Sequence, residues 1–232
     1  MVYYRIILEG GKVFEFPINR QRQYDQATDL APHSPWTQLT FCQCENCPLR
    51  SEYYRHCPAA VDVEQIATQF SQALSFEKAH VEVFTQERIY VKDCDMQTTL
   101  RALLGLVMAT SGCPILAQFR GLAQYHLPFA TMDETLFRTS GAYLLKQYYI
   151  WKTGGAPDLA MKGLEQFYKE VGTVNRCFKA RLDAAFDKVK DANLNAVGSL
   201  LYISMGVGFS IEDNLSELQN KFFPDLVGQR PV

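Results

Sequence analysis

Cysteine is the residue type whose number and spacing in this sequence could do chemistry. The segment FCQCENCPL, residues 41–49, contains three cysteines, of which Cys44 and Cys47 form a Cys-x-x-Cys pair. A two-residue spacer lets both thiolates of one turn face the same ion, and Zn²⁺ takes four ligands at about 2.0–2.3 Å in a tetrahedron. The spacing therefore predicts a zinc site, and the ligands that we expect are Cys44, Cys47, Cys57 and Cys113.

Three of these four cysteines are followed by proline, in the segments CPLRSEYY, CPAAVDVEQIATQF and CPILAQFRGLAQ. Proline is favoured at the first position of a helix, so each preceding cysteine falls at a predicted N-cap. The unpaired N–H groups at a helix start lower the pKa of a thiol and stabilise the thiolate that a metal binds. This argument favours Cys113 as the fourth ligand, and Cys42, His56 and His126 remain the alternatives.

Other interpretations of the cysteines stay open. They can be buried thiols without an ion, or ligands of an iron–sulfur cluster, because Cys-Pro steps also occur in ferredoxin-like sequences. A thioredoxin-type redox pair is a weaker alternative, since that motif needs a βαβ context and no parallel sheet is indicated. Cys94 and Cys177 have no companion residue nearby in the sequence, and we expect them to be ordinary core or surface residues.

The composition indicates a globular protein and argues against several functional classes. Of 232 residues, 47% are apolar and 21% charged, and the formal net charge of −2 argues against a broad nucleic-acid-binding face. The N-terminal segment MVYYRIILEGGKV lacks the pattern of a signal peptide, and the longest apolar window, from Asn195, is too short and interrupted for a membrane span. We therefore expect a cytoplasmic protein, where clustered cysteines bind metals more often than they form disulfides.

Two β-hairpins are predicted in the first part of the chain, before the helical segments. The first covers residues 4–18, where β-forming side chains flank Gly10-Gly11, a pair that supplies the positive φ of a tight turn. The second covers residues 80–93, in which apolar and polar residues alternate on both sides of a turn. The polar segment 19–36 contains two prolines and is expected to be a surface loop, followed by a short strand at 37–41.

The chain after Asp95 shows helical periodicity. Thr131 and Glu134 form a predicted capping box at the start of one helix. The expected helical segments are 95–112, 131–154, 158–185 and 193–223, the last broken near Gly206-Val207-Gly208. Together these patterns predict an α+β protein in which a small antiparallel β-rich region, 1–94, packs on a mainly helical body, 95–232, as one integrated domain. The metal site would tie the two parts together through Cys113.

Several other polar or aromatic segments have ordinary structural explanations. His126 and Arg138 could act as a general base and an anion anchor, but we interpret His126 as a loop residue and Asp133 and Glu134 as parts of a helix start. The segment KDANLNAVG is interpreted as a loop that ends in an N-cap. The aromatic series AYLLKQYYIW predicts a core or interface stripe, and a homodimer through this face is the assembly that we consider. No nucleophile elbow, P-loop, dinucleotide fingerprint or HExxH motif occurs.

The segments CENCPL, HCPAA, SGCPILAQFRGLAQYHLPF, ETLFRTSGAYLLKQY and DANLNA together resemble an uncharacterised family of bacterial proteins, recognised as a domain of unknown function. The likeness extends over nearly the whole chain. It implies that Cys44, Cys47, Cys57 and Cys113 match the motif positions of the family and that Cys42 is an addition. The resemblance implies no activity.

The sequence thus predicts a cytoplasmic metal-binding protein with structural zinc, which serves as a binding or regulatory module for a protein or a small-molecule ligand. We expect neither nucleic acid nor a membrane among its partners. The alternative is an iron–sulfur or thiol-based redox protein or sensor, or an enzyme whose active site is assembled from distant residues. The sequence does not indicate a reaction.

Overall fold

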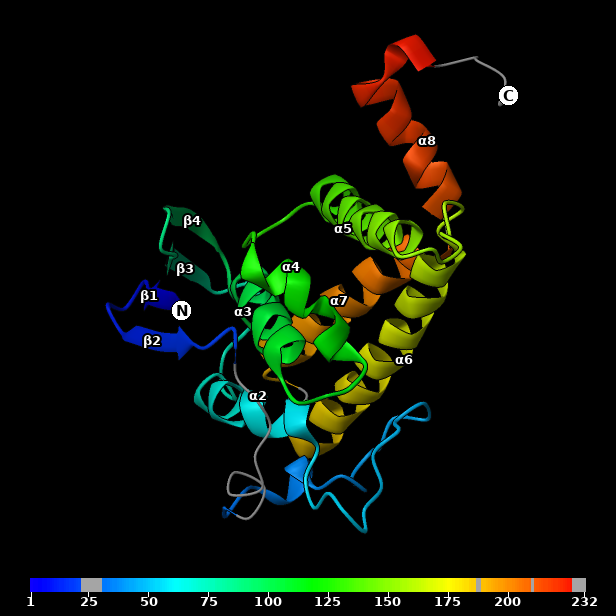
Figure 1. Cartoon of the computed structure of the whole chain (residues 1–232). Helices are drawn as coiled ribbons and strands as arrows, with labels where there is room; N and C mark the ends of the chain where they lie inside the picture. The colour runs from blue at the N-terminus through cyan, green and yellow to red at the C-terminus, as the bar shows by residue number, and fades with distance from the viewer. Residues whose placement is uncertain (22–30, 187–188, 210, 227–232) are drawn as a thin grey trace. The chain divides into compact units, whose positions relative to one another are not determined.

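The computed structural model of the chain describes residues 1–21, 31–186, 189–209 and 211–226 (Figure 1). Its strands are β1 (Val2–Leu8), β2 (Val13–Ile18), β3 (Lys78–Phe84) and β4 (Ile89–Asp95). They form one antiparallel sheet in the order β2-β1-β3-β4. Helices provide most of the remaining regular structure, so the predicted α+β class and both predicted hairpins are confirmed.

One α-helix lies between β2 and β3, and the others follow β4. The α-helices are α2 (Pro58–Gln69), α3 (Met96–Thr110), α4 (Arg120–Gln124), α5 (Met132–Lys152), α6 (Lys162–Ala185), α7 (Ala192–Phe209) and α8 (Ile211–Phe222). Short 3-10 helices are η1 (Pro35–Thr37), η2 (Leu116–Phe119) and η3 (Pro224–Leu226). In the described part of the chain, no helix has both the length and the apolar character needed to cross a membrane.

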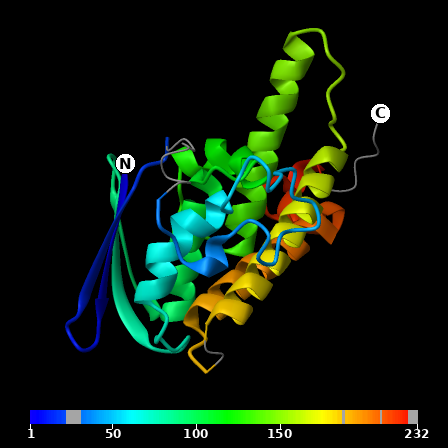
Figure 2. The same ribbon diagram turned by 90° about the horizontal axis from the view of Figure 1, so that it is seen from below.

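The sheet has one buried face because apolar residues occupy alternate positions of its central strands. Tyr4 of β1 lies opposite Phe16 of β2 on one side and Val83 of β3 on the other. The residues of this face are almost completely buried: Val2, Tyr4, Ile6, Phe16, Ala79, Val81 and Val83. The helices α2 and α3 lie on this side of the sheet (Figure 2), and Phe70, at the end of α2, contacts Phe16 with ring centroids 6.0 Å apart.

Local chemistry fixes where the elements begin and end. Gly11 has a φ of +78° in the turn between β1 and β2, a conformation that glycine adopts without a steric penalty. The side chain of Asp95 caps α3 by accepting the Thr98 N–H at 2.8 Å. The predicted capping box of α5 is confirmed, since Thr131 accepts the Glu134 N–H at 3.2 Å and the Glu134 carboxylate accepts the Thr131 N–H at 2.8 Å.

The chain divides into two compact units. The first combines Met1–Phe129 with Thr173–Leu201, and the second combines Ala130–Gly172 with Tyr202–Val232. All seven cysteines belong to the first unit. The predicted division of the chain into residues 1–94 and 95–232 stays a prediction.

The second unit is held together by contacts between helices that are remote in sequence. Phe137 of α5 stacks on Phe222 of α8 with ring centroids 5.3 Å apart. Tyr168 of α6 donates from its hydroxyl to Thr139 of α5 at 3.0 Å, and both residues are buried. This unit therefore has its own aromatic and hydrogen-bonded contacts, independent of the sheet.

Two predictions of short elements near the cysteines are wrong. Residues 37–41 do not form a strand: Gln38 makes an isolated bridge with His56 after η1 ends at Thr37. The segment after Cys47 does not form a helix either, so Cys47 is not an N-cap. The carbonyl oxygen of Leu49 accepts an N–H of the Gln43 side-chain amide at 3.0 Å.

The last helical segment, predicted at 193–223 with a break near Gly206-Val207-Gly208, consists of two helices. The first, α7, ends at Phe209, and α8 begins at Ile211, so the break lies just after these glycines. A Cβ at Gly208 would stand 3.3 Å from the backbone nitrogen of Lys169 in α6, so glycine lets these helices approach closely here. Of the predicted loop at 19–36, residues 22–30 lie outside the described part of the chain.

Candidate functional site

The cysteine-rich loop, residues 40–56, is fixed at both ends by backbone hydrogen bonds. The N–H of Leu39 donates to the carbonyl oxygen of Arg55 at 3.0 Å. The N–H of Cys57 donates to the carbonyl oxygen of Thr37 at 2.8 Å. The loop therefore leaves and returns at one place, and its last residue is followed directly by Cys57 and α2.

Inside the cysteine-rich loop, Cys44 and Cys47 bracket a tight turn. The N–H of Cys47 donates to the carbonyl oxygen of Cys44 at 3.0 Å, which brings together the two residues of the Cys-x-x-Cys pair. Both are partly buried, whereas Cys42 is exposed and has a φ of +48°. Of the three cysteines in this loop, the two with the spacing of a metal-binding turn are thus the ones withdrawn from solvent.

Cys57 is the N-cap of α2, with Pro58 at the first helical position, as the sequence predicts. Burial raises the pKa of the Cys57 thiol above its ordinary value. The positive charge of Arg181 opposes this rise, and so do the backbone N–H groups of Ala60 and Ala59 near the sulfur. The start of α2 therefore offers the stabilisation of a thiolate that was expected of a helix N-terminus.

Cys113 lies in the turn that follows α3. Its carbonyl oxygen accepts the N–H of Ala117 at 2.9 Å, and the first helix that follows is the 3-10 helix η2, from Leu116. The prediction that Cys113 is the N-cap of an α-helix is therefore wrong, because a turn separates Cys113 from the next helix. Burial raises the pKa of the Cys113 thiol to about 11, although the N–H groups of Leu116 and Ile115 near its sulfur act in the opposite direction.

The four predicted ligands are mutual neighbours in the structure. Burial raises the pKa of Cys44 far above its ordinary value, and the thiols of Cys57, Cys113 and Cys47 add to this rise. The thiol of Cys47 also raises the pKa of Cys57 and of Cys113, and the thiol of Cys57 raises the pKa of Cys113. Every pair among the four thiols is therefore close enough to interact electrostatically. They come from three separate segments: the loop, the start of α2 and the turn after α3.

The thiols do not form a ready-made coordination shell. Within residues 1–21, 31–186, 189–209 and 211–226, no three His, Cys, Asp or Glu side chains are arranged so that they could hold a metal ion. All seven cysteines are free thiols. The side chains of Cys44, Cys47, Cys57 and Cys113 would have to turn toward a common centre to bind an ion, and the metal tie remains a prediction.

A fifth cysteine, Cys177 of α6, also lies beside the group. Its thiol raises the pKa of Cys44. Only burial and the thiol of Cys57 have larger effects on that pKa. The sequence predicts an ordinary residue at Cys177, because the nearest cysteine in the sequence is Cys113. Only the packing of α6 against the cysteine-rich loop brings Cys177 near Cys44, so no local sequence motif predicts that these two residues are close. We use the name cysteine cluster for these five residues: Cys44, Cys47, Cys57, Cys113 and Cys177.

The remaining candidates for the fourth ligand make other contacts. His56 is buried, and its Nδ1 lies 2.8 Å from the hydroxyl oxygen of Thr37. The Nε2 of His126 lies 2.6 Å from the hydroxyl oxygen of Tyr4, on the buried face of the sheet. One ring nitrogen of each imidazole is therefore within hydrogen-bond distance of a hydroxyl group, and the fourth ligand stays a prediction.

Two groups of polar residues with predicted structural roles lie at helix starts or take part in packing. Glu134 completes the capping box of α5. Asp191 directly precedes α7, and its carboxylate accepts the N–H of Ser75 at 2.8 Å. Asn193 is buried and donates from its side chain to the carbonyl oxygen of Ala67 at 3.0 Å. These contacts join the start of α7 to α2 and to the segment between α2 and β3.

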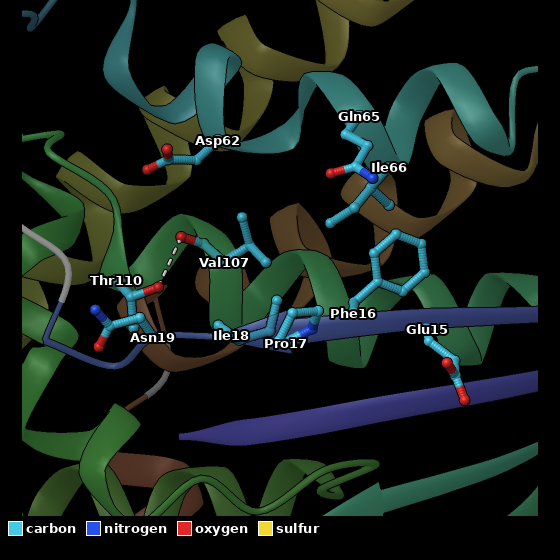
Figure 3. A pocket seen from close by; sticks show the side chains of 10 residues that line it. All are labelled: Glu15, Phe16, Pro17, Ile18, Asn19, Asp62, Gln65, Ile66, Val107 and Thr110. Atoms are coloured by element: carbon cyan, nitrogen blue, oxygen red, sulfur yellow. Dashed lines mark hydrogen bonds between the residues drawn. The ribbon is translucent and has the colours of Figure 1, made fainter. Parts of the chain in front are cut away.

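A cavity of about 230 Å³, which no sequence motif predicts, lies between the end of β2, α2 and α3. Figure 3 shows Asp62 and Gln65 on α2 across from Thr110 on α3. The hydroxyl of Thr110 donates to the carbonyl oxygen of Val107 at 3.1 Å, so it is engaged within its own helix. The volume is smaller than that of pockets for drug-sized ligands, about 300–1,000 Å³. We assign no ligand to this cavity.

The fold and the site define an α+β protein with a cluster of free thiols. A family model described as a domain of unknown function, DUF6901, matches residues 2–223. The chain belongs to this family, and the predicted resemblance to a domain of unknown function over nearly the whole chain is confirmed. Comparisons with curated proteins and with solved structures found no match.

Proposed function

We propose that the protein is a metal-binding module in which Cys44, Cys47, Cys57 and Cys113 hold one structural Zn²⁺. The observation that carries this proposal is that every pair among these four thiols interacts electrostatically, although the residues come from three separate segments. The four sulfurs thus lie in one region of the unit, where rotation of their side chains would bring them toward one tetrahedral centre. Four protein ligands also close the coordination shell, which favours a structural role over a catalytic one.

The surroundings of the sulfurs suit thiolates bound to a metal. Backbone N–H groups near the sulfurs of Cys57 and Cys113 lower the pKa of each thiol. Burial raises the pKa of both thiols by more than these groups lower it, so a divalent cation would supply the missing stabilisation of the thiolates. Binding would release the thiol protons and link metal affinity to pH.

The bound ion would hold together parts of the first compact unit that are remote in sequence. The described residues of the cysteine-rich loop, 40–56, contain no helix or named strand. A metal that joins this loop to the start of α2 and to the turn after α3 would contribute to the free energy of folding, because the unfolded chain does not hold the ligands together. The module would then depend on the ion for the shape of this surface.

Elemental analysis of the untagged protein, purified without chelators, tests the proposal. We expect one zinc per chain in colourless protein. A matched control is Cys42→Ser, since Cys42 is exposed in the same loop and should be dispensable for metal binding. Protein that contains no metal under these conditions, and takes none up when Zn²⁺ is added to the reduced form, would contradict the proposal. A brown protein with iron and sulfide would favour the iron–sulfur alternative.

A thiol-based redox role is the second candidate, favoured by the position of Cys177 beside Cys44. Hydrogen peroxide would take two electrons and two protons from the two thiols, forming a Cys44–Cys177 disulfide and two molecules of water. Peptide mapping by mass spectrometry after mild peroxide treatment would detect this bond. Zinc bound to Cys44 should protect it, so disulfide formation only in chelator-treated protein would favour the structural role.

The module also requires a binding surface, and the aromatic face of α5 is the one that we propose for a homodimer. Several large side chains of this helix are exposed: Phe137, Leu144, Leu145, Tyr148, Tyr149 and Trp151. Clusters of exposed aromatic side chains mark interaction surfaces more often than free surface. Light scattering coupled to size exclusion tests this proposal, because a dimer should become a monomer when Tyr149 and Trp151 are both changed to lysine. A monomeric wild-type protein contradicts it.

A further inference from the structure

Arg181 of α6 is a charged side chain that the fold buries almost completely, with 2% of its surface exposed. One guanidinium nitrogen donates to the carbonyl oxygens of Trp36 and Gln38, at 2.6 and 2.7 Å. The other terminal nitrogen donates to the carbonyl oxygen of Leu39 at 3.4 Å. The side chain thus holds the backbone segment that leads into the cysteine-rich loop.

The positive charge of Arg181 lacks a carboxylate partner within the part of the chain that the structure describes. A guanidinium stays charged at every pH that a folded protein tolerates. Carbonyl oxygens satisfy its hydrogen bonds but do not neutralise it, and a buried charge that nothing balances is costly. An anionic group near Arg181 would remove this cost.

The cysteine cluster is the neighbouring group that can become an anion. Arg181 lies close enough to Cys57 to act on its sulfur electrostatically. The two are also joined through the backbone, because Thr37, between Trp36 and Gln38, accepts the N–H of Cys57 at 2.8 Å. Free thiols are neutral, whereas four thiolates around one divalent cation leave a formal excess of about two negative charges.

We infer that Arg181 is a charge-balancing residue of the cysteine cluster, which increases the affinity of the site for a divalent, thiophilic cation whose thiolate complex is anionic. This inference rests on the proposed function and adds a specific residue outside the ligand set. Arg181 touches no metal and is a positioning residue: it anchors residues 36–39 and supplies one positive charge beside Cys57. Its effect should therefore depend on whether the metal is bound.

Competition titrations of the reduced, full-length protein with Zn²⁺ and a chromophoric chelator test the inference. Arg181→Gln keeps hydrogen-bond donors but removes the charge, and we expect zinc affinity to fall about 10- to 100-fold, as for other residues that support metal ligands. Arg181→Lys keeps the charge and should recover most of the affinity. Equal affinities of Arg181→Gln and the wild type would overturn the inference.

Arg176→Gln is the matched control. Arg176 lies on the same helix and pairs with Glu45, inside the Cys-x-x-Cys turn, at 3.4 Å. Both side chains of this pair are largely exposed, so water already screens their charges. We expect the zinc affinity of Arg176→Gln to stay within about twofold of the wild type. If Arg176→Gln lost as much zinc affinity as Arg181→Gln, any positive charge on this helix would have the same effect. That result would contradict the inference.

A second measurement separates charge balance from a purely structural role. Thermal unfolding of Arg181→Gln, with and without Zn²⁺, should show a larger loss of stability in the zinc-bound form. Equal losses in both forms, or a folded Arg181→Lys that binds zinc ten times more weakly than the wild type, would contradict charge balance. If the wild type itself binds no zinc, the proposed function fails. If the wild type binds zinc and Arg181→Gln binds it equally well, only the role of Arg181 fails.

Discussion

The N–H of Cys57 donates to the carbonyl oxygen of Thr37 at 2.8 Å, directly beside the carbonyl oxygens that receive the guanidinium of Arg181. One short stretch of backbone thereby contacts both the start of α2 and the buried cation of α6. The same stretch leads into the loop that carries Cys44 and Cys47. Changes at the cysteines should therefore alter the stability of the first compact unit as well as its metal content.

Replacing Cys57 with serine should abolish zinc binding and lower the free energy of unfolding by about 3–5 kcal/mol, the size of the largest single-residue effects. A serine hydroxyl is a poor zinc ligand, and the remaining three thiolates would leave the shell open. Chemical denaturation of the zinc-loaded wild type and of the variant measures the difference. Cys42→Ser, in the same loop, should change stability by less than about 0.5 kcal/mol. A Cys57→Ser variant that binds no metal but unfolds like the wild type contradicts the structural role of the ion.

Cys113→Ser tests whether the remote segment after α3 belongs to the site. We expect zinc affinity to fall at least about 100-fold, because the chain would lose one of four strong ligands. Cys94→Ser is the control, since Cys94 lies in β4 with its sulfur 3.3 Å from the Thr99 hydroxyl. Isothermal titration with Zn²⁺ compares the two variants. Undiminished affinity in Cys113→Ser would show that another group, such as Cys177, completes the shell.

The raised pKa of Cys113, about 11 against an ordinary value of 9.0, predicts how the metal-free protein responds to alkaline pH. Above pH 9.0 the unfolded chain loses the thiol proton while the folded chain retains it, so the unfolded state is favoured increasingly up to about pH 11. This single group should lower the free energy of unfolding by about 2 kcal/mol across that interval. Denaturation of chelator-treated wild type and of Cys113→Ala measures it, and equal pH dependence of both contradicts the prediction.

The zinc-loaded protein should respond to pH in the opposite direction. Protons compete with the cation for the thiolates, so acid removes the ion and the stability that it provides. We expect the difference in melting temperature between zinc-loaded and chelator-treated protein to shrink as the pH falls. A difference that stays constant from neutral pH to the pH of acid unfolding would argue against thiolate ligands.

The two hairpins and the capping box could be predicted from the sequence because their determinants are local. Gly11 supplies the turn between β1 and β2, and Thr131 and Glu134 satisfy each other within one helical turn. The structure of the segments around Cys47 could not be predicted, because contacts with residues outside these segments determine it. An isolated bridge to His56 replaces the expected strand at 37–41.

The candidate site was predictable only in part, for the same physical reason. The spacing of Cys44 and Cys47 and the Cys-Pro step at Cys57 are local signals of a metal-binding turn and a helix start. Cys177 and Arg181 lie on one face of α6, four residues apart, but nothing in their own segment points to the cysteine-rich loop. Their place beside the other thiols follows from how α6 packs, which a single sequence does not show.

A change in the second compact unit should leave the metal site unaffected. Thr131→Ala removes the hydroxyl that caps α5 and should cost about 1 kcal/mol of stability. The zinc content and affinity should equal those of the wild type, since every cysteine belongs to the first unit. Denaturation followed by tryptophan fluorescence, together with elemental analysis, checks both expectations. Loss of zinc in Thr131→Ala would show that the two units unfold as one.

X-ray absorption at the zinc K-edge of the loaded, full-length protein tests the central claim most directly, because it counts the atoms bound to the ion. We predict four sulfur neighbours at about 2.3 Å and no nitrogen or oxygen in the first shell. The spectrum of Cys113→Ser should then show three sulfurs and one lighter atom. A shell with nitrogen or oxygen in the wild type, or a protein that retains no zinc for the measurement, would contradict a site made of Cys44, Cys47, Cys57 and Cys113.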